Sequence, residues 1–476
     1  MDIDSKFKAD DQFSSRSFDE VDHPFRSKFE RDRDRIMYSK AFRRLSGKTQ
    51  VFLTGGDDHI RTRLTHTLEV AQIAMTISKA LKLNLPLTEA IAYGHDIGHT
   101  PFGHVGERTL NYIMNGCYKI KNFKYHESEG NKGFKHNWQG LRVVTRLEQL
   151  NREFYGLNLT DYTLWGIVYH SNTKYKKCEK CISDNTCTLN HNMELCISEG
   201  QLLSLDFYER YANLIYEKSW SVEGLVVAMA DEVAQRHHDV EDGIEANIID
   251  KTDLIEKFEE CFEKYLNEDE KQLIDLIKEE ADNVFYTPMI SKLIVNFLTT
   301  KLINDCKLNL HSISKEFNID NSFDFNEKKK KEIIKKYELE EIINYDEDFL
   351  EKEKEFQKYL MNRILNSHIA QTMDGKASYI IRQLFKAYIT NPQQLPDNVI
   401  TDIYSEFLEQ EEYDAIIESS RTTVTGELRN KLEVDYFTIC NDEFKCLLMR
   451  SICDYIAGMT DKFAMNQYKL LYGIVE

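Results

Sequence analysis

Residues 92–107 read AYGHDIGHTPFGHVGE, and they hold three histidines, an aspartate, a glutamate and four glycines. Helix-forming, largely apolar segments lie on both sides, so these ionisable groups face an apolar neighbourhood. An unpaired charge in such surroundings costs free energy. We therefore expect the side chains of this segment to share a partner that takes up their lone pairs, and a metal ion is the first candidate.

The composition predicts an all-α fold. The chain has 476 residues but only 6 prolines and 20 glycines, and this scarcity of helix breakers favours long helices over many-turned β architectures. Its 42% hydrophobic and 30% charged residues are ordinary for a globular protein. A formal net charge of -19 argues against generic binding to nucleic acid or to an anionic membrane.

No segment predicts export or insertion into a membrane. The N-terminal stretch MDIDSKFKADDQFSSRSF lacks the apolar region of a signal peptide, and no run in the chain approaches about 18 apolar residues. We therefore expect a cytoplasmic protein. In that compartment the ten cysteines stay mostly reduced, so a cluster of them indicates metal binding more than disulfides.

Changes in composition divide the chain into three parts. Residues 1–60 are predicted to form an N-terminal segment that packs on the core, and the family resemblance described below implies that this segment contributes substrate contacts. Residues 61–245 form the core, which carries a polar, cysteine-bearing insertion at residues 171–200. Residues 246–476 form a C-terminal helical region.

Two runs of charged residues are predicted to belong to helix surfaces and not to binding sites. The four lysines of Lys328–Lys331 are predicted to be a solvated helix face and not a binding patch. The alternating charges of RDRDR, residues 31–35, are predicted to pair within their own helix, with a subunit interface or phosphate contacts as alternatives.

Three helical segments place polar side chains on apolar faces. The first face holds His66 together with Val70, Ile73, Ile77 and Leu81. A lone histidine on such a face is more often a core residue than a ligand. In the next helix, however, His95 follows Leu87 and Ile91 on one face, and Asp96 comes directly after it. Asp231 then lies inside the apolar run LVVAMADEVA, where a carboxylate requires a cation or a donor.

These four polar residues predict a metal site. Adjacent helical residues diverge by about 100°, so His95 and Asp96 can reach one ion only near the end of a helix. Two histidines and two aspartates make a mixed nitrogen and oxygen set, which suits Mn, Fe, Co or Ni, with Mg and Zn as alternatives. Four protein ligands on a six-coordinate ion leave positions open for water and a phosphate oxygen, which is typical of a catalytic site.

The spacing H…HD…D is the signature of the HD phosphohydrolase superfamily, and longer segments resemble one family within it. The segments RDRDRIMYSKAFRRLSGKTQVF, RTRLTHTLEVAQIA, GHDIGHTPFGHVGE, KHNWQGLRVVTRLE and ADEVAQRHHDVEDGI resemble bacterial deoxyguanosine triphosphate triphosphohydrolases. Near the C-terminus, IIRQLFKAYITNPQQLP and DYIAGMTDKFA resemble later segments of that family. The similarity follows the order of the chain and leaves out two insertions and roughly residues 250–350.

The resemblance implies an HD-domain helical core with an additional C-terminal helical region. It implies an enzyme that cleaves a deoxynucleoside triphosphate (dNTP) at the α-phosphorus, releases the deoxynucleoside and tripolyphosphate, and prefers dGTP. The implied metal ligands are the same four residues, His66, His95, Asp96 and Asp231. The implied catalytic residues are His104, Glu107 and His99, and the implied substrate-binding residues are Gln50, Arg63, Asp239 and His136.

Each of these residues has a chemical role in that scheme. A histidine held by a carboxylate can move a proton near neutral pH, which suits His104 and Glu107, although a capping or packing histidine is the alternative for His104. His99 and Arg63 are implied to contact phosphate. The other implied pair, Gln50 and Asp239, holds the sugar 3′-hydroxyl. For His136, a direct role and a structural role in the layer behind the ligands both stay open.

One position departs from the family. Many relatives carry a tyrosine four residues after the last aspartate ligand, and this chain has Gln235. The departure puts the base preference in doubt. It does not put the reaction in doubt. Two other functions stay open on separate grounds, namely an HD phosphohydrolase that acts on another nucleotide and a catalytically idle dNTP sensor. Release of tripolyphosphate would distinguish the dNTP triphosphohydrolase from these two alternatives.

The cysteine insertion predicts a separate structural site. The segment CEKCISDNTCTLNHNMELC carries Cys178, Cys181, Cys187 and Cys196, with His191 as a substitute ligand. Such spacing suits structural zinc, which would order a polar insertion that has no core of its own. An iron–sulfur cluster, a redox switch and unliganded thiols are the alternatives, and the family resemblance does not include this element.

The resemblance also bears on cofactors and partners. It implies a divalent ion at the HD motif, with Mn, Mg, Fe or Co as candidates, and a homo-oligomer. Some relatives are activated by a dNTP at a second site, so an activating dNTP is a candidate partner here. Neither a membrane nor nucleic acid is an expected partner.

Overall fold

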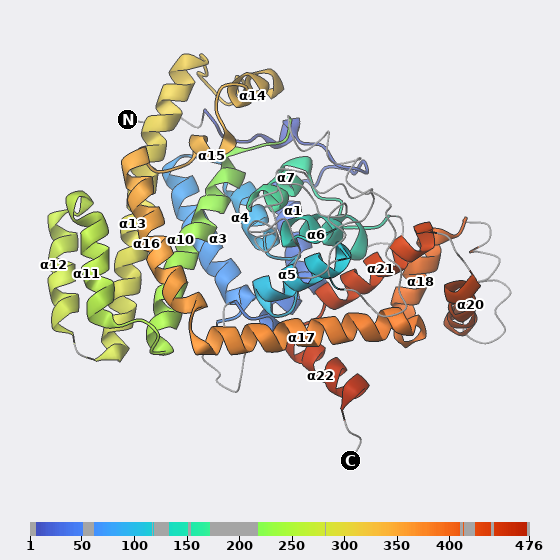
Figure 1. The fold of residues 1–476 in the computed structure, drawn as a ribbon. Helices are drawn as coiled ribbons and strands as arrows, with labels where there is room; N and C mark the ends of the chain where they lie inside the picture. Colours follow the sequence, from blue (N-terminus) through green and yellow to red (C-terminus); the bar gives the residue numbers. More distant parts are fainter. Residues whose placement is uncertain are drawn as a thin grey trace.

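The computed structural model describes residues 6–50, 61–116, 118, 133–150, 154–171, 218–280, 282–409, 413, 424–438 and 442–473 (Figure 1). Within these ranges the chain is α-helical, and its only β pairing consists of two isolated bridges, Thr49 with Thr62 and Gln149 with Gly156. The predicted all-α fold is confirmed. None of the helices described is long and apolar enough to cross a bilayer.

The helices fall into two groups along the chain. The first group comprises α1 (Lys28–Tyr38), α2 (Lys40–Arg44), α3 (Arg63–Ala80), α4 (Leu85–Gly94), α5 (Gly103–Met114), α6 (His136–Arg142), α7 (Asp161–Tyr169) and α10 (Val222–Glu245). The second group comprises α11 (Lys251–Phe262), α12 (Glu268–Glu279), α13 (Asn283–Glu316), α14 (Glu327–Ile334), α15 (Leu339–Ile342), α16 (Glu347–Leu365), α17 (His368–Thr390), α18 (Asp397–Phe407), α20 (Val424–Thr438), α21 (Asp442–Ala457) and α22 (Asp461–Tyr472).

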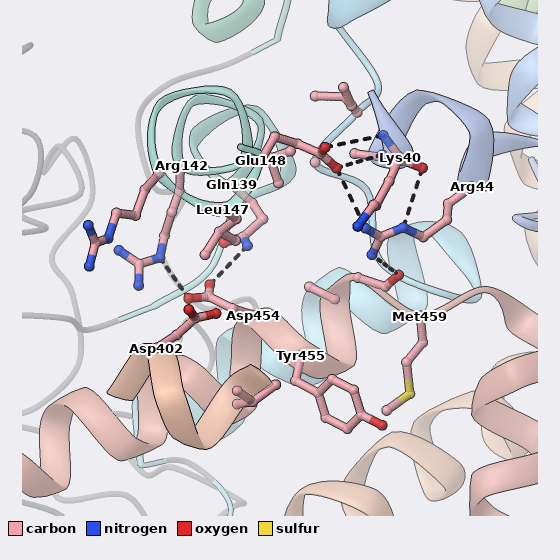
Figure 2. A pocket seen from close by; sticks show the side chains of 18 of the residues that line it. Lys40, Arg44, Gln139, Arg142, Leu147, Glu148, Asp402, Asp454, Tyr455 and Met459 are labelled. Carbon is pink, nitrogen blue, oxygen red and sulfur yellow. Dashed lines mark hydrogen bonds and ion pairs between the residues drawn. The ribbon is translucent and has the colours of Figure 1, made fainter. Parts of the chain in front are cut away.

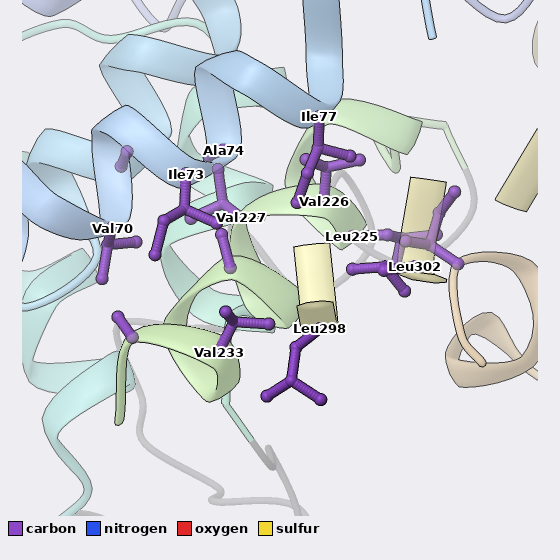
Figure 3. Close-up of a cluster of buried hydrophobic side chains, with 14 of the residues drawn as sticks. Val70, Ile73, Ala74, Ile77, Leu225, Val226, Val227, Val233, Leu298 and Leu302 are labelled. Carbon is purple, nitrogen blue, oxygen red and sulfur yellow. The ribbon is translucent and has the colours of Figure 1, made fainter. Parts of the chain in front are cut away.

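The core is built on the packing of α3 against α10, with α13 on the far side of α10 (Figure 3). The apolar stripe predicted on α3 is buried, and it faces valines and a leucine of α10. The side chains that meet here include Val70, Ile73, Ile77, Val226, Val227, Leu298 and Leu302. Burial of an aliphatic side chain of this size contributes roughly 1.5–3 kcal/mol, so this contact fixes the relative position of the two helices.

Buried apolar side chains form two clusters. The first runs from Phe7 to Ile364 and includes the N-terminal segment, α3, α4, α10 and α13. The second joins α5 to α17, α18, α20, α21 and α22. The helix α5 follows the histidine-rich loop, so it carries that loop from the first cluster to the second. The division at residues 60 and 245 stays a prediction.

The RDRDR segment lies in α1, and its charges pair mostly with residues outside that helix. Arg31 and Arg35 both bind Glu20, with nitrogen–oxygen distances of 2.6 Å. Asp32 is buried and accepts hydrogen bonds from the backbone and hydroxyl of Thr160, which caps α7. Within α1, only the neighbours Arg33 and Asp34 form an ion pair. The prediction of intrahelical pairing therefore holds only for Arg33 and Asp34, and the other charges connect α1 to neighbouring segments.

The lysine run in α14 contains one buried member. Lys330 is only 1% exposed, and its Nζ donates to the hydroxyl of Tyr162 at 2.8 Å. Its Nζ also lies 5.1 Å from the ring centroid of Phe325. Burial lowers the pKa of Lys330 to about 7. The prediction of a solvated face is wrong for this residue, since the eight-residue helix turns one lysine of the run inward.

The buried lysine gives a pH-dependent prediction. Between pH 7 and 10.5 the unfolded chain binds a proton on Lys330 and the folded chain does not, so wild-type stability rises with pH in that window by up to about 1.4 kcal/mol per pH unit. In Lys330→Met this contribution is absent. The difference in free energy of unfolding, variant minus wild type, should fall as the pH is raised from 7 to 10, measured by chemical denaturation. Lys328→Met, at an exposed position of the same run, is the control and should show no such trend.

Candidate active site

Three helices deliver the predicted metal ligands to one point. His66 lies in the first turn of α3, His95 caps the C-terminus of α4, and Asp231 lies near the middle of α10. The Nε2 atom of His66 lies 3.0 Å from Asp231 Oδ1, and His95 Nε2 lies 3.9 Å from the same oxygen. One ligand atom from each residue fits within 4.8 Å of the others, so the three can share one ion.

Asp96 completes this group from the turn after α4. Its Oδ2 lies 3.9 Å from His66 Nε2, and its Oδ1 lies 3.7 Å from His95 Nε2. The helix ends at Gly94, so the backbone turns just where His95 and Asp96 have to face the same point. His95 and Asp96 thus lie at the end of a helix, as the sequence predicted, and all four residues lie close together.

The ring of His95 leaves one nitrogen available to ligate a metal ion. His95 Nδ1 donates to the carbonyl of Ala92 at 2.6 Å, because a carbonyl only accepts. Its Nε2 is then a lone pair, and this atom is buried with no hydrogen-bond partner among the residues described. A buried lone pair without a partner is costly, and a divalent ion would satisfy it. The donor set of imidazole and carboxylate fits such an ion.

The carboxylates of the group are held ionised. Burial opposes ionisation of Asp96, but Arg63, together with His99 and His95, outweighs it and keeps the pKa of Asp96 well below its ordinary value. Burial also opposes ionisation of Asp231, and the hydrogen bond and charge of His66 lower its pKa nonetheless. Both carboxylates therefore offer negative oxygen ligands at neutral pH.

Arg63 is buried beside the ligands with part of its guanidinium unused. Its Nη1 lies 2.8 Å from Asp96 Oδ2, while Nε and Nη2 have no hydrogen-bond partner among the described residues. A Cβ atom added to Gly103 would lie 3.1 Å from Nη2, so the free edge of the guanidinium faces the N-terminus of α5. A guanidinium and a helix N-terminus together favour an anion such as phosphate.

His99 lies between this arginine and the next histidine. Its Nε2 is 3.1 Å from Asp96 Oδ1, and its ring stacks on that of His136 with centroids 3.9 Å apart. Burial, followed by the charges of Arg63 and His136, lowers the pKa of His99 well below its ordinary value. The buried Nδ1 of His99 has no hydrogen-bond partner in the described part of the chain.

The predicted pair His104 and Glu107 is part of a larger group. The nearest nitrogen of His104 is 3.8 Å from Glu107 Oε2, and its side chain is 66% exposed. Glu107 lies closer to His136, whose Nδ1 is 2.7 Å from the same oxygen. Burial opposes ionisation of Glu107, but His136 and His104 keep its pKa well below the ordinary value. One carboxylate thus serves two histidines, an exposed one and a buried one.

His170 belongs to this group and was missed in the sequence. Its Nε2 lies 3.1 Å from His136 Nε2, and its Nδ1 donates to the carbonyl of Ile167 at 2.7 Å. Burial, followed by the charges of His95 and His136, lowers the pKa of His170 to about 3. In the sequence, His170 is marked only by its place directly after the apolar segment DYTLWGIVY, and nothing there indicates that it meets His136.

The predicted sugar-binding pair is connected through the position that departs from the family. Gln50 donates to Gln235 at 3.2 Å, and Gln235 donates to Asp239 at 2.6 Å. Burial raises the pKa of Asp239 to about 6, against the opposing hydrogen bond from Gln235. Gln235 therefore occupies the space between the two residues that the resemblance assigns to the 3′-hydroxyl.

Two more residues adjoin the ligands from the side away from Asp96. His238 Nδ1 lies 3.3 Å from the Nδ1 of His66, and His238 Nε2 hydrogen-bonds to Glu69. His238 follows Asp231 by seven residues, so the sequence places both on one face of a helix, but it gives no sign that Glu69 takes part. Burial lowers the pKa of His238 to about 3.

A cavity of about 660 Å³ lies behind the loop that follows α4 (Figure 2). Its lining includes Ile97 and Gly98 but none of the four proposed ligands. Ion pairs cross its walls, as between Arg142 and Asp454 at 2.7 Å. The cavity is therefore a space separate from the candidate metal site, although both adjoin the same loop.

The four cysteines of the insertion, Cys178, Cys181, Cys187 and Cys196, and also His191, lie outside the described residues. The zinc site stays a prediction.

Known proteins resemble the chain over almost its whole length. Residues 63–284 match the HD domain, and residues 343–470 match the Phosphohydrolase-associated domain. Three relatives carry the name "Deoxyguanosinetriphosphate triphosphohydrolase-like protein". Those from Rickettsia felis and Rickettsia bellii are 32% and 33% identical over 465 residues, which is 97% of each chain. The one from Geobacter metallireducens is 30% identical over 459 residues, covering 96% of this chain and 91% of the relative.

The ligand assignment is tested by Asp231→Ala. The variant should bind Mn²⁺ roughly 100-fold more weakly or not at all, because a charged oxygen ligand is removed. It should remain folded, since the side chain of Asp231 is 28% exposed and leaves no large cavity. Metal content after dialysis and the melting temperature are the measurements. Asp253→Ala, which removes a surface carboxylate paired with Arg363, is the control. Unchanged Mn²⁺ binding in Asp231→Ala would refute the assignment.

Proposed function

As the chain belongs to the deoxyguanosinetriphosphate triphosphohydrolase-like family of HD-domain phosphohydrolases, we propose that it is a metal-dependent dNTP triphosphohydrolase. The proposed reaction converts a dNTP, with dGTP preferred, to the deoxynucleoside and tripolyphosphate. The observation that carries the proposal is the cluster of His66, His95 and Asp231 beside the unused guanidinium edge of Arg63. Ligands for a cation and a donor for an anion lie together there, as the hydrolysis of a polyphosphate ester requires.

The residues that would hold the ion are His66, His95, Asp96 and Asp231. An ion bound there would supply Lewis-acid polarisation of the α-phosphate and a lowered pKa for bound water. The protein's own contribution begins with Arg63, whose free N–H groups face the N-terminus of α5 and are proposed to bind a phosphate oxygen. His99, buried against Asp96, is proposed to orient a second phosphate oxygen.

Proton transfer is assigned to His104. Its exposed ring can approach substrate, and its Nδ1 lies on the side of Glu107. A proton moved to or from the reacting oxygen would be carried by this imidazole, while Glu107 stabilises the protonated form. Because Glu107 also binds the buried His136, it is held in place whether or not His104 is protonated. We therefore assign His136 a positioning role through Glu107.

Selection of a deoxynucleotide is assigned to Gln50, Gln235 and Asp239. The three side chains form one hydrogen-bonded row, and a sugar 3′-hydroxyl can donate to the carboxylate at its end. Gln235 is shorter than the tyrosine of many relatives and has no ring to pack on the sugar. Because many relatives have a tyrosine where this chain has Gln235, the proposed preference for dGTP is the part of the function that most needs a direct test.

The remaining proposals concern assembly and regulation. We propose a homo-oligomer, Mn²⁺ or a similar ion as cofactor, and a cytoplasmic location. An activating dNTP is assigned to the cavity of Figure 2, because ligand binding there would press on the back of Ile97 and Gly98. Lys48 reinforces this assignment. It lines the cavity and donates to the carbonyls of His99 and Ala457, so it links one wall of the cavity to the loop that carries Asp96.

Product analysis tests the proposed reaction. The purified protein is incubated with each of the four dNTPs and with GTP, in Mn²⁺ or Mg²⁺, and nucleosides are separated from phosphates. Deoxynucleoside with tripolyphosphate is the expected result, with dGTP turned over fastest. Monophosphate, orthophosphate or pyrophosphate as product would contradict it. If no single dNTP is hydrolysed, mixtures of two dNTPs test for activation, and failure of the mixtures would favour either another nucleotide as substrate or the idle sensor.

The row of sugar contacts predicts a pH effect on KM. Since the pKa of Asp239 is raised to about 6, its carboxylate becomes protonated below that pH and is lost as an ionised acceptor. The KM for dGTP should therefore rise as the pH falls from 7 to 5, by up to about tenfold per pH unit below 6. The KM for 2′,3′-dideoxy-GTP, which lacks the 3′-hydroxyl, should not show this additional rise. Equal pH profiles for the two nucleotides would contradict the role of Asp239.

A further inference from the structure

Glu69 and His238 continue the metal site outward from His66. Glu69 lies three residues after His66 in α3, and His238 lies seven residues after Asp231 in α10. His66 presents Nε2 to Asp231 and Nδ1 to the Nδ1 of His238, at 3.0 and 3.3 Å. His238 is fully buried, and its other nitrogen, Nε2, hydrogen-bonds to Glu69 Oε2. A carboxylate, an imidazole and a second imidazole thus form one row that ends at the metal ligands.

The hydrogen atoms along this row can be placed by elimination. An ionised carboxylate only accepts, so the Nε2 of His238 must carry the hydrogen that Glu69 receives. A neutral His238 then has a lone pair on Nδ1. The facing Nδ1 of His66 must carry the hydrogen between them, because two facing lone pairs would repel each other. With Nδ1 carrying that hydrogen, Nε2 of His66 is the nitrogen left to ligate an ion, and it faces Asp231 Oδ1 at 3.0 Å. A bound ion would take the place of the hydrogen that Nε2 gives to Asp231.

We propose that Glu69 and His238 are positioning residues that fix the tautomer and orientation of His66 as a metal ligand. This inference rests on the proposed metal site and deepens it, since it explains how one of its ligands is held ready. His95 reaches the same state by a different route, because its Nδ1 donates to the carbonyl of Ala92. A backbone carbonyl fixes one imidazole ligand, and a carboxylate acting through a second imidazole fixes the other.

Glu69 is itself anchored at the protein surface. Arg61 Nε lies 3.7 Å from its Oε2, and His237 Nε2 lies 3.6 Å from the same oxygen. Arg61 also pairs with Asp242 at 3.0 Å, which ties the start of α3 to the end of α10. Burial opposes ionisation of Glu69, but hydrogen bonds from His237 and His238 keep its pKa below the ordinary value. The acceptor role of Glu69 is therefore maintained at neutral pH.

The row should affect metal affinity more than it affects folding. Groups that orient a ligating histidine from behind typically change metal affinity or activity by about 10- to 100-fold when removed. Glu69 is partly exposed, so its replacement leaves no unpaired buried charge. A loss of metal affinity without a loss of thermal stability is thus the mark that distinguishes a positioning role from a structural one.

The test is a double-mutant cycle read by Mn²⁺ affinity. Full-length protein is stripped of metal, and free Mn²⁺ is measured by electron paramagnetic resonance for wild type, Glu69→Met, His238→Asn and the double variant. Glu69→Met removes the acceptor, and we expect a 10- to 100-fold weaker Kd. In His238→Asn the amide oxygen can still accept from His66 but no longer contacts Glu69. Glu69→Met should therefore add less than about threefold in that background.

Two further variants sharpen the result. Glu69→Gln keeps a carbonyl acceptor for His238 and should recover part of the affinity lost in Glu69→Met. Glu89→Gln, which removes another partly exposed carboxylate paired with an arginine, is the matched control and should bind Mn²⁺ like wild type. In metal-free protein labelled with ¹⁵N-histidine, the Nδ1 of His66 should carry hydrogen in wild type and be partly unprotonated in Glu69→Met. The His66→Gln spectrum assigns its signals.

The outcomes separate the inference from the proposed function. Failure of wild type to bind Mn²⁺ would remove the metal site, and the positioning role with it. Normal Mn²⁺ binding in both wild type and Glu69→Met would overturn the positioning role alone. An equal loss from Glu69→Met with and without His238→Asn would show that Glu69 does not act through His238. Binding of a second Mn²⁺ that is lost in Glu69→Met would also overturn it, because Glu69, His237 and His238 would then be ligands of another ion.

Discussion

The packing of α3 against α10 is the contact on which the candidate site depends. Each helix contributes one proposed ligand, His66 from α3 and Asp231 from α10, and each lies beside the apolar face by which the two helices pack. Sliding one helix by a single residue would move a ligand by about 1.5 Å along the axis and also turn it away. The 3.0 Å distance between His66 Nε2 and Asp231 Oδ1 is therefore a consequence of how the aliphatic side chains pack.

The same two helices also carry the supporting polar groups. Glu69 lies one turn from His66, and His238 lies two turns from Asp231, so a register that brings the ligands together also brings their supports together. The helix α3 also supplies a positive charge to the site, because Arg63, one turn before His66, lies 2.8 Å from Asp96. The charge of the carboxylates is thus partly balanced by Arg63, whose Nε and Nη2 have no hydrogen-bond partner among the described residues.

The sequence predicted the parts of the site that lie on periodic faces. The burial of the stripe from Val70 to Ile77 and the meeting of His95 and Asp96 at a helix end follow from the helical repeat and from the end of the apolar pattern. Helical periodicity shows which face a residue occupies but not which distant residue it meets. For that reason it gave no partner for His170, assigned no role to Glu69, and misplaced Lys330, whose burial depends on Tyr162, 168 positions away in the chain. The charges of RDRDR pair outside their helix for the same reason.

The C-terminal helix α22 contacts two segments of the candidate site, so the second buried cluster also affects the geometry of that site. Asp461, the first residue of α22, accepts from the backbone N–H of Thr49 and from that of Phe102, both at 2.9 Å. Thr49 precedes Gln50, and Phe102 is the N-cap of the helix that bears His104 and Glu107. One buried carboxylate from the end of the chain therefore binds both the backbone next to Gln50 and the start of the helix that bears His104 and Glu107. The C-terminal helix α22 therefore helps to set the geometry of the candidate site, even though it supplies none of the four proposed ligands.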